Sequence, residues 1–235
     1  MYSFHSHVRF SEVDAQKHLT LYGILNYFQD CSIFHSESVG SGIDQLSAQG
    51  YAWVLSSWQI QIDRYPLLGE EITISTWPHN FKGFYGYRNF TIRDGSGSVA
   101  ACANTIWSLI DLASMTPAKI PPEILAAYPL EPSFPMENAP RKIKAPTDGI
   151  SGEPAIVHHF QIDTNQHMNN AQYVLLAQEF LPEHACIRQM RADYRKAAHL
   201  QDRIYPVVST EGIVTTVSLN DETGSPYAII EFIRR

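Results

Sequence analysis

The chain has 235 residues, of which 44% are hydrophobic and 17% charged, a composition typical of a folded protein rather than a disordered one. Asp and Glu outnumber Lys and Arg by 24 to 17, and the net charge of −7 argues against general affinity for nucleic acid or anionic membranes. No apolar run is long enough for a signal peptide or a membrane span, which predicts a cytoplasmic protein. Cys31, Cys102 and Cys186 stand far apart, so we expect no disulfide framework, no metal site and no cofactor.

The first half of the chain predicts one long helix followed by strands. Residues 21–37 carry apolar side chains over most of the helical circumference, which is typical of a buried helix. Strand-like runs follow at 52–62, 71–77, 87–93 and 99–111. A buried helix followed by an antiparallel meander indicates an α+β fold in which a sheet curls around the helix.

A proline-rich segment separates this half from the next. Eight prolines fall within 30 positions: Pro117, Pro121, Pro122, Pro129, Pro132, Pro135, Pro140 and Pro146. Such a density favours an extended linker. We therefore predict an N-terminal domain over 1–127, a linker over 128–146 and a C-terminal domain over 147–235.

The second half repeats the pattern of the first. Residues 13–19 and 162–168 both read apolar, Asp, three residues, His, apolar, and each leads into a predicted helix. Further matches follow in the same order, at 63–72 with 194–204 and at the turns 94–97 and 221–224. Three matches in order favour a structural duplication over coincidence.

The repeated segment of the second half also carries candidate catalytic groups. Asp163, Asn165 and His167 alternate along the chain, so an extended backbone would point all three to one side. A helix follows them, with Asn169 or Asn170 as its N-cap, and its first N–H groups can stabilise an anion. An acid, an amide and an imidazole there suit the attack of water on a carbonyl carbon. The alternative is a structural turn and cap, because the first copy keeps Asp14 and His18 but has Gln16 in place of Asn165.

The same segment resembles a known family. Residues 163–173, with Glu179 beyond them, are similar to the D-x-N-Q-H-x-N-N-x-x-Y…E signature of plant and bacterial acyl-acyl carrier protein (acyl-ACP) thioesterases. The first half resembles that family too, at 8–14, 53–56, 64–66, 76–78 and 107–111. The resemblance implies a tandem (double) hotdog fold, which agrees with the duplication. It also implies hydrolysis of fatty acyl-ACP thioesters with Asp163, Asn165 and His167 at the active site.

One departure from the family stands out. The plant enzymes carry a Glu-Cys pair after a Tyr-Arg-Arg stretch, with catalytic roles assigned to both residues. Here Tyr194-Arg195-Lys196 is followed by Ala197 and Ala198. No thiol nucleophile and no carboxylate base can therefore act from these two positions.

The implied substrate predicts two further sites. An acyl chain needs an apolar channel between sheet and helix, for which the candidates are Leu21, Leu25, Phe28, Trp53, Leu55 and Trp58, each of which could equally be ordinary core. An acidic carrier protein, presenting the acyl group on phosphopantetheine, needs a basic docking surface. The candidates for this surface are Arg188, Arg191, Arg195 and Lys196, with a second cluster at Arg141, Lys142 and Lys144.

Two other functions remain open from the sequence. An acyl-CoA thioesterase would share the fold and the chemistry. A non-catalytic acyl-binding hotdog module would explain the alanines at 197 and 198. The oligomeric state is also open, because two hotdogs in one chain can form the equivalent of a hotdog dimer without a further homodimer.

Overall fold

The computed structural model describes all residues from Met1 to Arg235. Contacts divide the chain into two compact units. The first unit contains Met1–Ser56 and Ile60–Asn138, and the second contains Ser57–Gln59 and Ala139–Arg235. No helix is both long and apolar enough to cross a membrane.

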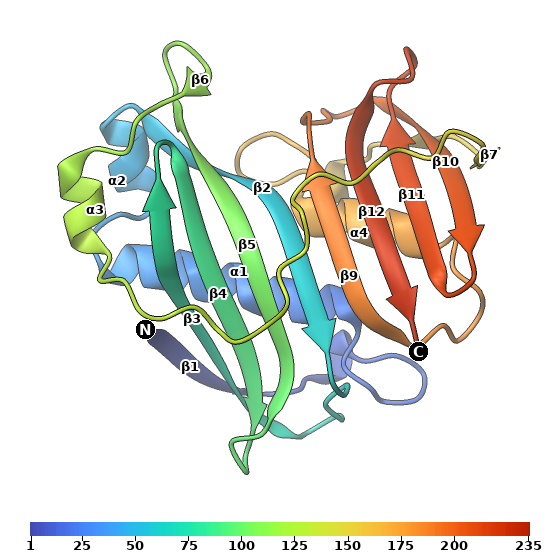
Figure 1. Ribbon diagram of the computed structural model, residues 1–235, viewed down its shortest axis with the longest axis horizontal. Coiled ribbons are helices and arrows are strands. Elements are labelled where there is room, and N and C mark those ends of the chain that lie inside the picture. Colours follow the sequence, from blue (N-terminus) through green and yellow to red (C-terminus); the bar gives the residue numbers. More distant parts are fainter. The chain divides into compact units, whose positions relative to one another are not determined.

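The first unit is an antiparallel sheet with a long helix on one face (Figure 1). Its strands lie in the order β1 (Tyr2–His7), β3 (Glu71–Lys82), β4 (Tyr85–Asp94), β5 (Val99–Asp111) and β2 (Tyr51–Ile62), with the short β6 (Thr116–Pro117) paired to β5. The four strands predicted from the sequence are present. Strand β1, which pairs with β3 from Tyr2↔Thr76 to His7↔Glu71, was not predicted.

Helix α1 (Leu21–Ser38) forms the core of this unit. Its N-cap is Thr20, whose hydroxyl accepts the Gly23 N–H at 3.0 Å. The side chains of Ile24 and Phe28 are fully buried, and the Phe28 ring meets that of Phe90 on β4 at 5.2 Å between centroids. The predicted burial of the helix does not extend to its far end, where Phe34 is 45% exposed although its ring meets that of Phe4 on β1 at 5.6 Å between centroids.

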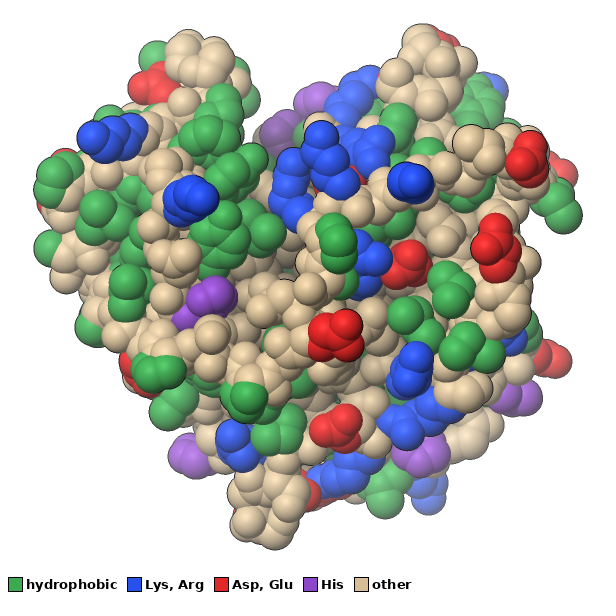
Figure 2. Space-filling view, viewed as in Figure 1, with side chains coloured by type: hydrophobic (Ala, Val, Ile, Leu, Met, Phe, Trp, Pro, Cys, Tyr) green, Lys and Arg blue, Asp and Glu red, His purple; other side chains and the backbone are tan.

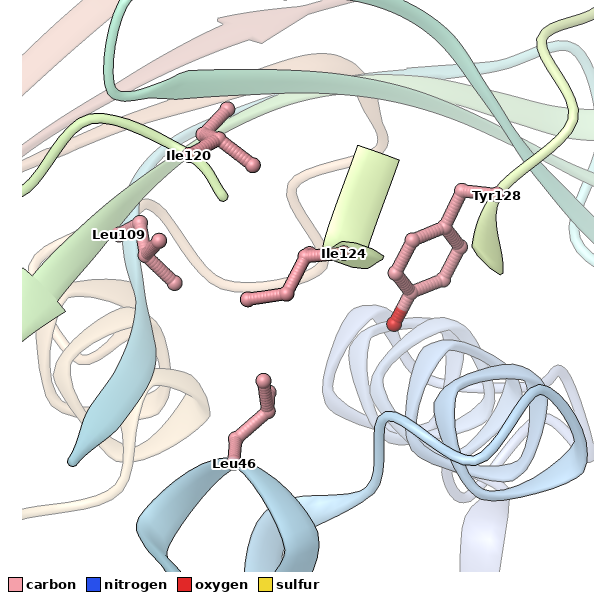
Figure 3. Close-up of a cluster of buried hydrophobic side chains, with 5 residues drawn as sticks. All are labelled: Leu46, Leu109, Ile120, Ile124 and Tyr128. Carbon is pink, nitrogen blue, oxygen red and sulfur yellow. The ribbon is translucent and has the colours of Figure 1, made fainter. Parts of the chain in front are cut away.

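A smaller apolar cluster lies under the short helices α2 (Ile43–Ala48) and α3 (Pro122–Ala127). Its five side chains point toward one another (Figure 3): Leu46, Leu109, Ile120, Ile124 and Tyr128. Trp53 packs against this cluster and stacks on Phe81 with centroids 6.3 Å apart. The tight fit needs Gly86 beneath, since an added Cβ would meet both rings at 3.2–3.3 Å.

The second unit repeats this arrangement with shorter elements. The strands lie in the order β9 (Ile187–Tyr194), β12 (Pro226–Arg234), β11 (Val214–Asn220), β10 (Arg203–Glu211) and β7 (Ile150–Ser151), with β8 (Ala155–Ile156) paired to β10. Helix α4 (Asn170–Gln178) packs on β11 and β12. It has nine residues and ends before Pro182.

The proline-rich linker is fastened to the sheets by hydrogen bonds. Trp77 Nε1 donates to the Pro132 carbonyl at 2.9 Å, on the sheet face opposite α1 (Figure 1). Farther along, the Ile143 N–H donates to Asp193 at 3.3 Å, and Arg195 Nη2 donates to the Ile143 carbonyl at 2.6 Å. The linker is extended, as predicted, because proline removes donors and fixes φ while these side chains hold its remaining polar groups.

Candidate active site

The segment that carries Asp163, Asn165 and His167 is a closed turn, not the extended backbone that would point all three side chains to one side. The Asp163 N–H donates to the His167 carbonyl at 2.8 Å, and the Gln166 N–H donates back to the Asp163 carbonyl at 3.0 Å. An Asp163 carboxylate oxygen accepts the Asn165 N–H at 2.8 Å, which folds the chain tightly after the aspartate. Gln166 turns the loop with a left-handed φ of 62°.

These contacts decide where the three side chains lie. Asp163 and His167 are half-buried at the base of the turn, whereas Asn165 is exposed at its tip. No hydrogen bond or ion pair joins the three side chains to one another. The turn therefore holds the acid, the amide and the imidazole within five residues. Because these side chains are not bonded to one another, each is available to contact a substrate.

The first unit contains the same turn. The Asp14 N–H donates to the His18 carbonyl at 2.9 Å, the Asp14 carboxylate accepts the Gln16 N–H at 2.9 Å, and Lys17 has a φ of 66°. A short 3₁₀ turn precedes each loop, η1 (Phe10–Glu12) and η2 (His159–Gln161). The two segments that match in sequence therefore also form the same set of hydrogen bonds. The aspartate and the backbone of the loop serve the fold in both units.

The two copies differ in where the histidine points. In the first, His18 Nδ1 lies 3.9 Å from the Asp14 carboxylate. In the second, the His167 ring instead meets the His199 ring edge to face, with centroids 4.9 Å apart. His199 was not among the residues predicted from the sequence. The one signal for it was its place directly after the two alanines that depart from the family.

Those alanines lie against the candidate loop. The Ala198 carbonyl accepts the Met168 N–H at 2.9 Å, and the Ala198 N–H donates to the Tyr173 hydroxyl oxygen of α4 at 2.8 Å. Ala198 is fully buried. Tyr173 is buried too, and this burial raises the pKa of its hydroxyl well above the usual value. The site thus carries no acid or thiol at the position where the plant enzymes have their pair.

Helix α4 begins directly after the loop. Its N-cap is Asn169, as predicted, and the Asn169 side chain accepts the Ala171 N–H at 2.9 Å. The positive end of the helix therefore lies within two residues of His167. Among His, Cys, Asp and Glu side chains, no group of three is arranged to hold a metal ion.

The candidate acyl-binding residues are core residues in this structure. Leu21, Leu25, Phe28, Leu55 and Trp58 are each at most 2% exposed, and Trp53 is half-buried. Trp58 belongs to the short stretch Ser57–Gln59 that groups with the second unit, and the others belong to the first. Their contact with an acyl chain stays a prediction.

The basic residues proposed for docking are mostly engaged within the protein. Arg191 is paired with Glu231 at 2.8 Å, Arg195 with Asp193 at 3.1 Å, and Lys196 with Asp221 at 2.6 Å. Arg188 is exposed. Figure 2 shows Lys and Arg side chains gathered over the end of β9 and the neighbouring linker. Docking by these four residues stays a prediction, and Arg188, near the start of β9, is the one whose charge is not used in an ion pair.

An antiparallel sheet with a helix on one face, present twice in one chain, defines the tandem hotdog class. Comparisons with known proteins agree. The chain matches the sequence model of the acyl-ACP thioesterase N-terminal domain over residues 1–128 and that of the C-terminal domain over residues 147–233. The chain belongs to the acyl-ACP thioesterase family.

Individual relatives are distant in sequence and close in fold. The chain is 25% identical over 224 residues to oleoyl-acyl carrier protein thioesterase 1, chloroplastic, of Arabidopsis thaliana, covering 86% of this chain and 62% of that protein. A palmitoyl-acyl carrier protein thioesterase of the same plant is 23% identical over 209 residues, covering 80% and 50%. The chain thus spans about half the length of the curated relatives it matches, 50% and 62% for these two.

Solved structures show the same fold along the whole chain. An acyl-ACP thioesterase from Bacteroides thetaiotaomicron aligns with a TM-score of 0.90 at 22% identity, covering 99% of this chain and 97% of that one. The 12:0-ACP thioesterase from Umbellularia californica aligns with a TM-score of 0.86 at 20% identity, covering 100% and 96%.

Proposed function

We propose that this protein hydrolyses fatty acyl-ACP thioesters and releases the free fatty acid. The observation that carries the proposal is the loop 163–168 with the family signature, folded in the second unit directly before α4. Membership of the family supports the same reaction. The relatives named above are thioesterases of acyl-ACP, and we propose the same substrate class here.

The residues of the loop suit the chemistry. Water adds to the thioester carbonyl carbon, and a base takes its proton. The tetrahedral oxyanion then expels the phosphopantetheine sulfur as a thiolate, which recovers the proton. A thiol leaves readily because its pKa is about 8.5, so no strong general acid is needed. We assign His167 to orienting the water or accepting its proton, Asn165 to holding the water or the carbonyl, and Asp163 to shaping the loop through the carboxylate oxygen that accepts the Asn165 N–H.

The test is steady-state hydrolysis by the purified protein. Acyl-ACP substrates of graded chain length should be cleaved with a kcat/KM that peaks at one length, because each methylene buried contributes about 0.8 kcal/mol until the channel is full. The same acyl groups on CoA form the comparison. Faster cleavage of acyl-CoA would make the protein an acyl-CoA thioesterase, and tight binding without turnover would make it an acyl-binding module.

One further expectation from the sequence stands as part of this proposal. We propose a cytoplasmic location, although the plant relatives named above are chloroplastic. The sequence also left open whether two copies of the chain form a homodimer. Light scattering on the purified protein, over a range of concentrations, measures its mass.

A further inference from the structure

The candidate site contains a histidine–carboxylate pair outside the family signature. His199 and Asp202 lie in the turn between β9 and β10, and His199 Nδ1 is 3.7 Å from Asp202 Oδ2. The His199 side chain is 62% exposed, so its other ring nitrogen can reach water. Its ring contacts that of His167. The pair thus lies beside the loop and one residue past Ala198.

The carboxylate of Asp202 is held in place from two other sides. It accepts the His199 N–H at 2.8 Å and the Tyr227 hydroxyl at 3.2 Å. Burial, followed by the nearby Asp202 charge, raises the pKa of Tyr227 to about 12, so its hydroxyl remains a donor at neutral pH. Asp202 Oδ2 is beyond hydrogen-bond distance of Nδ1 at 3.7 Å, but its negative charge on that side of the ring favours a proton on Nδ1 over one on Nε2. That tautomer leaves Nε2 of His199 as a proton acceptor.

The first unit shows what this turn requires for folding alone. Its Glu70 carboxylate accepts the Leu67 N–H at 2.9 Å, as Asp202 accepts that of His199. The backbone of Glu70 bonds to Val8 at 3.0 Å, as that of Asp202 bonds to Val157 at 2.9 Å. Leu67, which occupies the position of His199, is 50% exposed. The turn therefore forms with an aliphatic residue, and the fold does not call for an imidazole there.

We propose that His199 is a catalytic residue of the thioesterase site and that Asp202 positions it, together replacing the Glu-Cys pair that is alanine here. In this step Nε2 of His199 accepts a proton from the water whose oxygen bonds to the thioester carbonyl carbon. The C–S bond then breaks, and the proton passes to the departing thiolate. His167, in contact with the His199 ring, orients the same water. The inference rests on the proposed function and deepens it.

The decisive variants are His199→Ala and His199→Leu, the latter copying the residue that the first unit tolerates. Loss of a general base should lower kcat on the order of 100-fold, with KM and the urea midpoint of unfolding unchanged. Added imidazole should restore part of the rate in His199→Ala, because the position is open to solvent. Asp202→Asn keeps an oxygen acceptor for the backbone, and we expect a fall in kcat of roughly 10-fold.

Leu67→Ala, at the matching turn of the first unit, is the control and should leave kcat unchanged. A kcat within about threefold of wild type in both His199 variants overturns the inference, as does a loss that imidazole fails to relieve. The wild-type assay separates this from failure of the proposed function. If the wild type cleaves no thioester, the proposed function fails, whereas an active wild type with active His199 variants refutes only the role of His199.

Discussion

Four aspartates in this chain begin the same tight turn, and a fifth, Asp111, begins a longer one between β5 and β6. Asp14, Asp94, Asp163 and Asp221 each accept the N–H two residues ahead on their carboxylate, at 2.8–2.9 Å. The third residue after each aspartate has a positive φ, and it is Lys17, Gly97, Gln166 and Gly224 in turn. Two of these turns are plain β-hairpins. An aspartate in this setting is therefore explained by folding, and the chemistry of the candidate site depends on the residues that the hairpins lack.

The first prediction at the residue scale concerns His167. His167→Ala should lower kcat for acyl-ACP by about 100-fold or more, because the imidazole activates or orients the attacking water. His18→Ala is the matched control, since His18 occupies the same place in the first-unit loop, and its kcat should equal that of wild type. Equal losses in the two variants would mean that the histidine serves the loop and not the reaction.

A second prediction concerns the buried His35 on α1. Its Nδ1 accepts from Arg88 Nη1 at 2.8 Å, and burial, followed by the Arg88 charge, lowers its pKa to about 4. The unfolded chain, with an ordinary histidine pKa near 6.5, therefore binds the proton first as the pH falls. His35 therefore makes its full contribution to the free energy of unfolding above pH ~6.5. This contribution falls by up to about 3 kcal/mol as the pH falls toward 4.

His35→Gln keeps an acceptor for Arg88 but cannot take up the proton. Urea unfolding at pH 7 and pH 4.5 should show a smaller loss of stability in this variant than in wild type. The same loss in both proteins would assign the acid sensitivity to other groups.

At the scale of elements, the two units repeat an ion pair as well as a turn. Arg64, after β2, reaches Asp94 in the β4–β5 hairpin at 2.6 Å, and Lys196, after β9, reaches Asp221 in the β11–β12 hairpin at 2.6 Å. Each pair links a strand end to a hairpin that is distant in sequence. The pKa of both aspartates is held well below the usual range, mainly by Lys196 for Asp221, and by Ser96 and then Arg64 for Asp94.

Asp221→Asn tests this linkage, because asparagine can still form the turn but carries no charge. Because the pKa of Asp221 is lower in the folded protein, its charge stabilises the fold at pH values above about 4, the pKa of aspartate in the unfolded chain. That stabilisation is lost as the pH falls below this value. We expect a lower urea midpoint than wild type at pH 7 and a difference that shrinks toward pH 3. A difference that is independent of pH would indicate packing rather than charge.

At the scale of the whole molecule, the net charge of −7 opposes association with an acidic carrier protein. Docking of the proposed carrier-protein substrate must then rely on local basic groups. In the predicted cluster of Arg188, Arg191, Arg195 and Lys196, the last three already pair with acids of this chain. Arg188 is the exposed exception. The charge available for docking is smaller than the sequence suggests.

Arg188→Glu should raise KM for acyl-ACP about fivefold while KM for the same acyl group on uncharged pantetheine stays constant. Lys119→Glu makes the same charge change at an exposed position of the first unit and serves as the control. If both substrates respond alike, or if Lys119→Glu has the same effect, the docking surface lies elsewhere.

Local patterns in the sequence were enough for helices α1 and α4, strands β2 to β5 and the duplication. The apolar spacing of α1, the runs that became β2 to β5 and the Asp…His repeat all act over short distances, where side-chain periodicity and turn chemistry decide the conformation. Strand β1 was missed because none of its residues is buried, although their burial alternates regularly, and because the strand depends on pairing with β3.

The arrangement of side chains in the candidate site is set by contacts between segments that are distant in sequence. Asp163, Asn165 and His167 could be recognised as a motif in the sequence. The contact of His167 with His199, and the position of Asp202 behind His199, arise only when residues 196–202 fold back on the loop. The closed form of the turn also appears only in the folded chain. The ion pairs of Arg191, Arg195 and Lys196 likewise join strands that are far apart along the chain. Sequence by itself determined helices α1 and α4, strands β2 to β5 and the repeat, because those choices are local. Tertiary structure alone decided which charges are neutralised and which imidazoles meet, because both depend on distance in space.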